Sequence, residues 1–399
     1  MEPGMTNAGN NRETPRKSAS VLIGRLPLGG HYPVRIQSMT NTDTLDTKSS
    51  VAQCIRIIEA GADMVRLAAQ GIKEARNLEN IKREVRKAGF STPLIADIHF
   101  NPAAAETAAR IVEKVRINPG NYADRRASFI RNELSEKEYN EELERIHERI
   151  LPLINICREN DTAIRVGINH GSLSDRIMTR YGNTPEGMVQ SALEFINIFR
   201  SENFTRLVLS VKSSDTGVLL ESNRLLVKRM QENGMIFPVH LGVTEAGEGE
   251  DGRVRSAAGT GALLSEGIGD TIRVSLSEDP EKEIPVAREI VDFLCGPRGR
   301  IRTPVPAQDF VTRERLWKPE VITYNEGRYL KEDNSPFSGR MLIFNFNSPP
   351  LLSGRPDAGD YLNPVFDEDD PEKLVIRASA LLGRYFILRQ PEGICISNR

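Results

Sequence analysis

AIRVGIN, residues 163–169, is typical of a buried β-strand, because it is a short apolar run rich in β-branched residues that ends on a polar side chain. Seven other short β-branched runs lie along the chain: VRIQSMT (34–40), DMVRLA (63–68), LIADIHF (94–100), KVRINPG (114–120), RLVLSVK (206–212), PVHLGVT (238–244) and DTIRVSL (270–276). Near-continuous apolar runs of this kind are typical of strands buried on both faces of a parallel sheet.

The segments between these runs have the periodicity of amphipathic helices. Thr47 is expected to cap one of them, and Pro185 after Thr184 marks the first turn of another. Their apolar seams are Val51, Cys54, Ile55 and Ile58; Leu78, Ile81 and Val85; Tyr139, Leu143, Ile146, Ile150, Leu153 and Cys157; and Leu193, Ile196 and Phe199. Eight strand–helix units predict an α/β fold of the (β/α)8 TIM-barrel type. The competing fold, a doubly wound open sheet, often has a glycine-rich first turn, which SMTNTDT at 38–44 does not provide.

Composition sets the broad class. The 399 residues include 53 Lys and Arg and 55 Asp and Glu, so the net charge of -2 disfavours a general nucleic-acid binder. No apolar run reaches the ~18 residues of a membrane span, and the polar N-terminus has no secretory h-region. The four cysteines, at positions 54, 157, 295 and 395, form neither a CxxC pair nor a disulfide framework. A cytoplasmic location is therefore expected.

The regular alternation of runs and helices stops near Leu294. We expect a disordered tail at 1–19, a barrel at 20–295 and part of a second, less regular α+β domain at 296–399. Prolines, aromatics and acidic runs such as Phe366-Asp-Glu-Asp-Asp370 distinguish this last segment. The chain stops at Arg399 without an obvious terminal element, which suggests a fragment.

Polar side chains mark the carboxyl ends of the predicted strands, where active sites of such barrels lie. They are Arg66, Asp97, His99, Arg116, Asn118, Arg165, Asn169, Lys212, His240, Arg273 and Ser275, with Glu245 in the loop beyond. Residues two apart share a strand face, so Asp97 with His99 and Arg116 with Asn118 are expected to point into the barrel together. Glu245 has the opposite parity to His240 and is expected to act from the loop.

The charges of these residues do not balance. Five cations, Arg66, Arg116, Arg165, Lys212 and Arg273, meet only two candidate anions, Asp97 and Glu245. Buried cations without a partner are costly, and arginine forks match phosphate oxygens, so the mouth is predicted to bind a diphosphate. The alternative is that the arginines pair with acids inside the barrel, which we expect of Arg35 and Lys114, lower in their strands.

Two side chains admit further roles. His99 is either a general acid held by Asp97 or only a hydrogen-bonding residue. Lys212 is either a phosphate contact or the Schiff-base lysine of an aldolase that acts on phosphorylated sugars, which borohydride trapping would reveal. Besides the diphosphate-binding enzyme and the aldolase, a third hypothesis is that the chain is an inactive substrate-binding fragment.

Six motifs resemble those of 4-hydroxy-3-methylbut-2-enyl diphosphate synthases, the GcpE/IspG family of the methylerythritol phosphate route to isoprenoids. They are Ile36-Gln-Ser-Met-Thr-Asn-Thr42, Ala96-Asp-Ile-His-Phe100, Arg116-Ile-Asn-Pro-Gly-Asn121, Val211-Lys212, His240-Leu-Gly-Val-Thr-Glu-Ala246 and Leu264-Ser-Glu-Gly-Ile-Gly-Asp-Thr-Ile-Arg-Val-Ser-Leu276. The resemblance implies that the barrel binds 2-C-methyl-D-erythritol 2,4-cyclodiphosphate. It implies a [4Fe-4S] cluster on a separate domain, a two-electron reductive ring opening with loss of water, ferredoxin or flavodoxin as electron donor, and a possible homodimer.

The resemblance also assigns roles to residues. By it, the diphosphate would be held by Arg66, Arg116, Arg165, Lys212, Arg273 and Ser275, while the carbon skeleton would be lined and proton transfer assisted by Asp97, His99, Asn118, Asn169 and Glu245.

One departure from the family pattern is large. The family holds its cluster with three cysteines, two of them in CxxC, and a glutamate, whereas Cys295-Gly-Pro-Arg lacks the second cysteine and Cys395 is isolated. Residues 296–399 resemble the start of the domain that a longer, plant-like form inserts before its cluster domain. We therefore expect no metal ligands in this chain, and substrate binding without activity of the chain alone.

Overall fold

The computed structural model describes residues 18–122 and 134–296 and, farther along, 320–325, 328–331, 335, 337, 340–345, 360–388 and 393–398. The first 17 residues of the predicted tail lie outside this part of the chain. The next two residues contact the barrel, where Ala19 N donates to Ile236 O at 2.6 Å and Ser18 Oγ donates to Asp270 Oδ1 at 2.5 Å. The domain boundaries themselves stay predictions.

Eight parallel strands form the barrel, and each coincides with one of the eight runs of the sequence. In hydrogen-bonded order they are β8 (Leu207–Lys212), β7 (Ala163–Asn169), β6 (Lys114–Ile117), β5 (Leu94–Asp97), β4 (Met64–Ala68), β3 (Arg35–Met39), β10 (Thr271–Ile272) and β9 (His240–Leu241). A parallel bridge between Leu209 and Val239 joins the two ends of this order. The barrel is thus closed, which confirms the predicted (β/α)8 fold over the open sheet.

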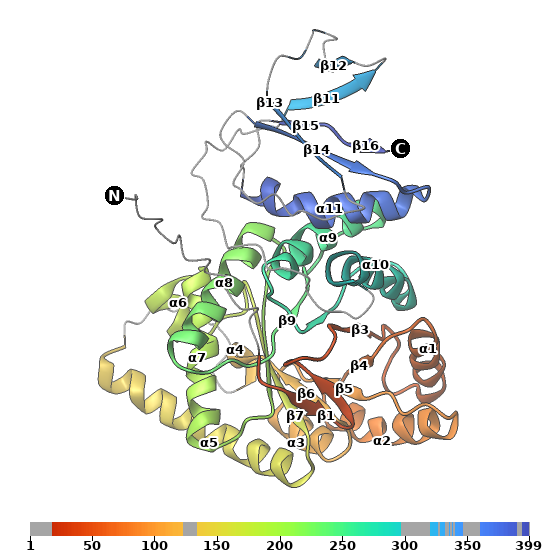
Figure 1. Ribbon diagram of the computed structural model, residues 1–399. Helices are drawn as coiled ribbons and strands as arrows, with labels where there is room; N and C mark the ends of the chain where they lie inside the picture. The colour runs from red at the N-terminus through yellow and green to blue at the C-terminus, as the bar shows by residue number, and fades with distance from the viewer. Residues whose placement is uncertain are drawn as a thin grey trace, which may run out of the picture.

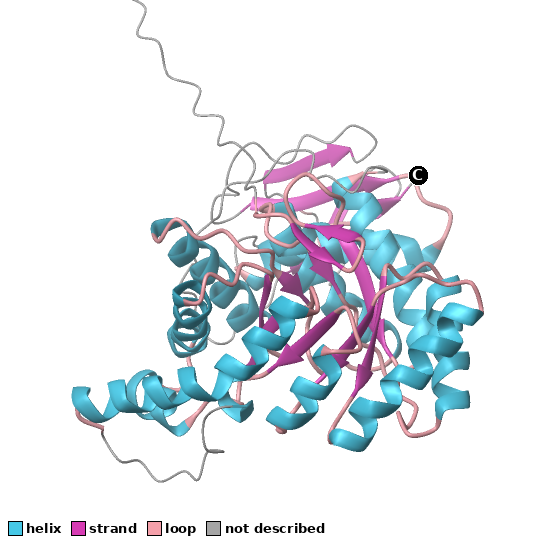
Figure 2. Ribbon diagram, turned by 90° about the horizontal axis from the view of Figure 1, so that it is seen from below, coloured by secondary structure: helices cyan, strands magenta, loops and turns pink. Residues whose placement is uncertain are grey.

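Helices surround the strands on all sides (Figure 1, Figure 2). The long ones are α1 (Thr47–Glu59), α2 (Ile72–Lys87), α3 (Pro102–Ala109), α5 (Glu136–Glu159), α7 (Pro185–Ser201), α8 (Thr216–Glu232), α9 (Gly249–Ser265) and α10 (Glu283–Cys295), and shorter turns are α4 (Pro119–Tyr122), α6 (Asp175–Tyr181) and η1 (Pro280–Lys282). Their predicted apolar seams face the strands, since Cys54, Leu78 and Ile150 are buried.

Side-chain caps fix where two of these helices begin. Thr184 accepts a hydrogen bond from Gly187 N at 3.1 Å and Pro185 fills the first helical position, as predicted. The prediction of Thr47 as a cap is wrong by one residue. Asp46 caps α1 instead, because its carboxylate accepts from Ser49 N at 3.1 Å.

A hairpin that was not predicted closes the amino-terminal end of the barrel. Strands β1 (Val21–Ile23) and β2 (Leu26–Leu28) pair antiparallel. Their side chains pack against the lowest layer inside the barrel, in a cluster made of Val21, Ile23, Leu28, Met64, Ile95, Ala163 and Val208. The polar strand ends therefore lie at the opposite, carboxyl-terminal end, above an apolar floor.

The segment after the barrel combines a mixed sheet with one helix. The strands are β11 (Glu320–Asn325), β12 (Arg328–Lys331), β13 (Arg340–Asn345), β14 (Asp360–Phe366), β15 (Gly393–Ile394) and β16 (Ser397–Asn398), in the order β12-β11-β15-β14-β13 with β16 beside β14. One face of α11 (Pro371–Ile387) covers this sheet through Leu381, Leu382 and Tyr385, and α11 also lies along α9 of the barrel (Figure 1). Among the described residues, no helix is long and apolar enough to cross a membrane.

Candidate anion-binding site

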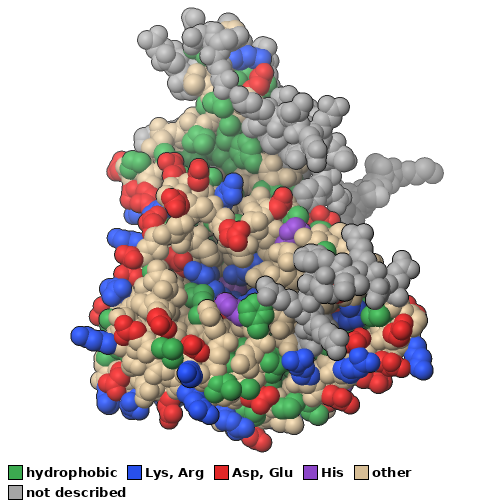
Figure 3. Space-filling model, turned by 180° about the vertical axis from the view of Figure 1, so that it is seen from behind, with side chains coloured by type: hydrophobic (Ala, Val, Ile, Leu, Met, Phe, Trp, Pro, Cys, Tyr) green, Lys and Arg blue, Asp and Glu red, His purple; other side chains and the backbone are tan. Residues whose placement is uncertain are grey.

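The predicted site residues lie where expected, at the carboxyl ends of the barrel strands. Buried among them are Arg66, Asp97, Arg116, Asn118, Arg165, Lys212 and His240. His99, Asn169, Arg273 and Ser275 are half-buried. Figure 3 shows Lys, Arg and His side chains gathered in a hollow on one face of the molecule.

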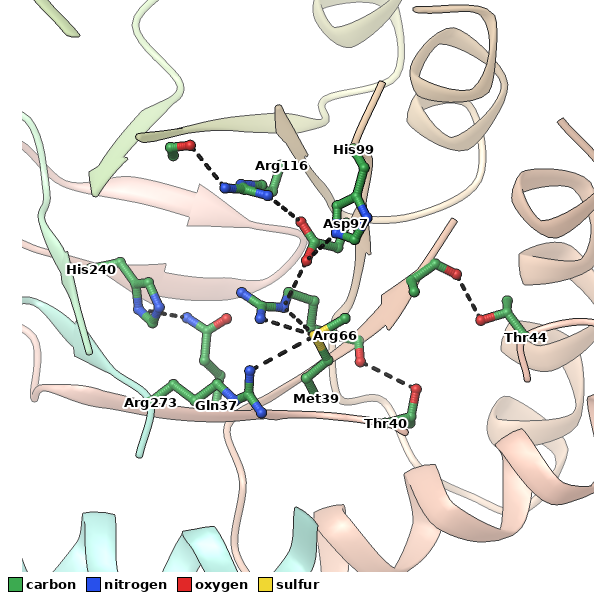
Figure 4. A network of polar contacts seen from close by, with 12 residues as sticks. Gln37, Met39, Thr40, Thr44, Arg66, Asp97, His99, Arg116, His240 and Arg273 are labelled. Atoms are coloured by element: carbon green, nitrogen blue, oxygen red, sulfur yellow. Dashed lines mark hydrogen bonds and ion pairs between the residues drawn. The ribbon is translucent and has the colours of Figure 1, made fainter. Parts of the chain in front are cut away.

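Asp97 is the centre of the polar network in Figure 4. Its Oδ1 lies 3.2 Å from Arg116 Nη1, and its Oδ2 lies 3.5 Å from both Arg66 Nε and His99 Nε2. Burial alone would raise the pKa of Asp97, but Arg66 and Arg116 outweigh burial and hold that pKa well below its usual range. Asp97 is therefore ionised, and one carboxylate is shared by two arginines and a histidine, as the pairing of Asp97 with His99 predicted.

Glu283 is an acid of the site that sequence reasoning missed. It is 1% exposed, and it accepts hydrogen bonds from Arg273 Nε at 3.0 Å and from Arg273 Nη2 at 2.9 Å. Ser38 Oγ and Leu276 N donate to the same carboxylate at 2.6 and 3.4 Å. Arg273 is thus neutralised within the fold, so the expectation that only Asp97 and Glu245 face the five cations is wrong. No strand-end rule could find Glu283, because it begins helix α10.

The thioether of Met39 is a weak acceptor that faces two arginines of the site. Arg66 points Nε and Nη2 at Met39 Sδ, at 3.0 and 2.9 Å, and Arg273 Nη1 lies 3.8 Å from the same sulfur (Figure 4). A thioether is a weak acceptor. Burial lowers the pKa of Arg66 to about 10, although Asp97 opposes this shift. The guanidinium of Arg66 therefore keeps donors that a stronger acceptor would satisfy.

Arg165 and Lys212 carry the surplus charge. Within the described residues, Arg165 Nε and Nη1 have no hydrogen-bond partner, although the residue is only 2% exposed. Burial, followed by Arg66 and Arg116, lowers the pKa of Arg165 well below its ordinary value. Burial and then Arg165 do the same to the pKa of Lys212, which makes no ion pair with any described residue. An anion in the mouth would relieve both groups.

Two glycines make room for these cations. A Cβ on Gly167 would lie 2.6 Å from Arg116 Nε, and the Gly167 carbonyl accepts from Arg116 Nη2 at 2.9 Å. A Cβ on Gly242 would lie 2.8 Å from Lys212 Nζ and 2.7 Å from the Arg273 carbonyl oxygen. The strand backbones therefore approach the cations more closely than any larger residue would allow.

His240 and Gln37 form a second buried pair. Gln37 Nε2 donates to Thr271 Oγ1 at 3.0 Å and lies 3.0 Å from His240 Nδ1 (Figure 4). Burial, with Lys212 and then Arg165 nearby, holds the pKa of His240 well below its usual value, so the ring is neutral and accepts at Nδ1. Its Nε2 and the Oδ1 of Asn118 have no partner among the described residues. The fold thus leaves one polar atom of each side chain unsatisfied in the described part of the chain.

The structure does not join every predicted residue to this network. Glu245 is exposed and has a left-handed backbone with φ 52°, so it lies in the loop after β9, as its parity predicted. Asn169 ends β7 and Ser275 follows β10, and the side chains of both make no hydrogen bond with described residues. Their roles stay predictions.

The lower layer of the barrel gives one confirmation and one correction. Arg35 Nη1 pairs with Asp63 Oδ1 at 3.3 Å, as predicted. The predicted acid partner of Lys114 is wrong, because the nearest acceptor of its Nζ is Met64 Sδ at 3.4 Å. Burial, then Arg165 and Arg66, lower the pKa of Lys114 well below its usual value.

The cysteines do not form a metal centre. The described residues contain no group of three His, Cys, Asp or Glu side chains placed to hold a metal ion. Cys54, Cys157 and Cys295 are buried on three different helices, and burial raises the pKa of each thiol to about 12. Cluster ligands are thiolates, so these cysteines do not fit an iron–sulfur cluster.

Fold and site together define a closed (β/α)8-barrel protein whose carboxyl-terminal mouth holds buried cations suited to an anionic ligand. The chain belongs to the GcpE family, because residues 18–288 match the family described as the GcpE TIM-barrel domain. This match confirms the family to which the six motifs pointed.

Relatives support the same family. The chain is 58% identical over 284 residues to the 4-hydroxy-3-methylbut-2-en-1-yl diphosphate synthase (flavodoxin) of Phocaeicola vulgatus, a match that covers 71% of this chain and 46% of the relative. It is 59% identical over 279 residues to the protein of the same name from Parabacteroides distasonis, covering 70% and 46%. The chain thus spans about half the length of the curated relatives it matches.

Proposed function

We propose that this chain is the substrate-binding part of an oxidoreductase that opens 2-C-methyl-D-erythritol 2,4-cyclodiphosphate reductively to 4-hydroxy-3-methylbut-2-enyl diphosphate, in the methylerythritol phosphate pathway of isoprenoid biosynthesis. The observation that carries the proposal is the pair of buried cations, Arg165 and Lys212, that make no ion pair with any described residue in a barrel of the GcpE family. Two phosphate groups would supply the missing negative charge.

We infer the roles of the site residues from the family resemblance, together with the contacts that some of them make. Arg165, Lys212 and the free donors of Arg66 would bind phosphate oxygens, with Ser275 at the rim. Arg116 and Arg273 would contribute from fixed positions, since Asp97 and Glu283 hold them. A carboxylate with so low a pKa is a poor proton donor, so Asp97 would orient the arginines and His99. His99, Asn118, Asn169 and Glu245 would face the carbon skeleton and assist proton transfer.

The electrons for the reaction would come from a group outside the anion site. The family implies a [4Fe-4S] cluster that supplies them, and the relatives' names specify flavodoxin as the donor. Ferredoxin is the other donor that the resemblance implies. The four cysteines of the sequence do not fit such a cluster, so no step of the reaction is routed through them. A cytoplasmic location and a homodimer belong to the same proposal.

Isothermal titration calorimetry with the cyclic diphosphate tests the proposal. We expect the chain to bind it, more tightly at low salt than at moderate salt. Arg116→Ala should weaken binding by ~2 kcal/mol or more. Arg206→Ala is the matched control, because Arg206 precedes β8 at the opposite end of the barrel and pairs with Asp161. Absence of binding at both salt concentrations would overturn the assignment.

Borohydride trapping provides an independent check on Lys212. A lysine with a lowered pKa is the kind that forms Schiff bases, so the aldolase alternative calls for a direct test. We expect no covalent adduct on Lys212 with carbonyl sugar phosphates. An adduct there would favour the aldolase.

A further inference from the structure

Arg253 joins three separate parts of the chain. It lies in the first turns of α9, and its Nη1 donates to Gly249 O at 3.0 Å. Its Nη1 and Nη2 also bind both carboxylate oxygens of Glu278, with 3.0 Å between Nη2 and Oε2, while Nε donates to Glu372 Oε1 at 2.6 Å. The side chain of Arg253 is only 15% exposed, so the fork is held in one position.

One of these contacts lies where α9 begins, and another holds a loop at the mouth of the barrel. Gly249 is the first residue of α9 and follows the loop after β9 that carries Glu245, and the backbone is left-handed at Glu245, Gly247 and Gly249. Glu278 lies three positions beyond Ser275 in the loop after β10. The same helix also lies against both loops, since a Cβ on Gly252 of α9 would lie 2.7 Å from Gly247 O and 3.0 Å from Leu276 Cδ2. Arg253 therefore connects the start of α9, which directly follows the Glu245 loop, with the Ser275 loop.

The third contact reaches the C-terminal unit. Glu372 lies in the first turn of α11, which packs closely on α9. A Cβ on Gly261 of α9 would lie 2.5 Å from Ala380 O, and Gly383 of α11 is equally close to the backbone of Ala258. Such close packing fixes how α11 lies along α9, and in this arrangement Glu372 lies within hydrogen-bond distance of Arg253.

A second tie holds α11 to the barrel without touching either loop. Arg377 of α11 donates from Nε to Glu289 Oε1 of α10 at 2.6 Å. The Arg377–Glu289 pair serves as a control for the Arg253–Glu372 pair, because both are arginine–glutamate ion pairs that join α11 to the barrel.

We propose that Arg253 is a positioning residue that couples the docking of α11 to the placement of the Glu245 and Ser275 loops over the anion site. The C-terminal unit would thereby support substrate binding although it contributes no residue to the mouth in the described part of the chain. The consequence for binding rests on the proposed function of these two loops, whereas the coupling between α11 and the loops does not.

Hydrogen–deuterium exchange and calorimetry on the full chain test this inference. Arg253→Met should raise exchange in residues 244–249 and 274–279 and weaken binding of the cyclic diphosphate by about tenfold. Glu372→Gln, a milder change that leaves Arg253 in place, should raise exchange in the same two loops and weaken binding by about threefold.

Glu289→Gln is the control, and it should leave exchange in both loops and the affinity unchanged. Unchanged exchange in both loops for Arg253→Met and Glu372→Gln would overturn the coupling, and so would an equal effect of Glu289→Gln. If the unaltered chain fails to bind the cyclic diphosphate, the proposed function fails, and the exchange measurements still decide the coupling.

Discussion

Replacement of Arg165 by methionine should make the ligand-free barrel more stable and should prevent it from binding its anion. Arg165 is 2% exposed and leaves Nε and Nη1 without partners among the described residues, and Arg66 and Arg116 are nearby cations. Each buried unsatisfied donor costs ~1–3 kcal/mol. Hydrophobic replacement of buried ionic groups gains ~1–4 kcal/mol in comparable cases. Asp97 offsets part of the repulsion, so we expect a gain of about 2 kcal/mol in the free energy of unfolding.

Differential scanning calorimetry measures this effect with and without the cyclic diphosphate. At ~2 °C per kcal/mol for a domain of this size, the melting temperature of Arg165→Met should rise by about 4 °C without ligand. Ligand at a hundredfold excess over its Kd should stabilise the unaltered chain by ~2.7 kcal/mol and the variant hardly at all. Arg206→Met, at the exposed opposite end, should change neither quantity. A variant that melts lower than the unaltered chain without ligand would refute the reasoning, because Arg165 would then be satisfied within the fold.

Three further changes test other parts of the site. Glu283→Gln should lower the free energy of unfolding by ~3 kcal/mol in urea titrations, since it leaves Arg273 without its carboxylate, and a loss below ~1 kcal/mol would contradict the pairing. Lys114→Met should flatten the pH dependence of stability. The pKa of Lys114 is lowered in the folded state, so the unfolded chain binds more protons, and stability should rise with pH toward 10.5 in the unaltered chain. An unchanged slope between about pH 7 and pH 9.5, measured by urea unfolding, would show that Lys114 does not titrate abnormally. Gly242→Ala should abolish binding of the cyclic diphosphate in calorimetry, because the new Cβ meets Lys212 Nζ at 2.8 Å and a carbonyl oxygen at 2.7 Å, and retained affinity would place Lys212 outside the site.

The fold could be predicted because its signals are local. Each strand lies in a run of β-branched residues, and several helices carry their own apolar seam and their own cap, as Thr184 and Pro185 show for α7. The hairpin at 21–28 could not be predicted, because its three-residue strands pack against side chains from four distant strands. Its stability comes from tertiary contacts that no short window of sequence contains.

The site residues likewise divide into those that could be predicted from the sequence and those that could not. Cations at the ends of parallel strands must meet at one end of a barrel, so Arg66, Arg116 and Arg165 could be placed from their positions in the runs. Their acid partners could not all be placed. Asp97 lies two positions before His99 on a predicted strand, but Glu283 reaches Arg273 from a helix. Nor could the sequence show that Lys114 has no acid partner among the described residues, because pairing depends on side chains from neighbouring strands.

The contrast between Arg273 and Arg165 explains why the mouth is only partly neutralised. A carboxylate beside a cation stabilises the empty barrel but competes with the phosphate for the same donors. Arg273 is fixed in direction by Glu283, to which Ser38 also donates, and so it gives a ligand orientation more than affinity. Arg165 has no such partner among the described residues, so the anion gains its donors without displacing an acid. The unpaired Arg165 destabilises the empty barrel, and binding of the anion removes that cost, so the affinity for the anion is higher. The two arginines therefore differ in effect although each follows the same apolar-Arg-apolar pattern.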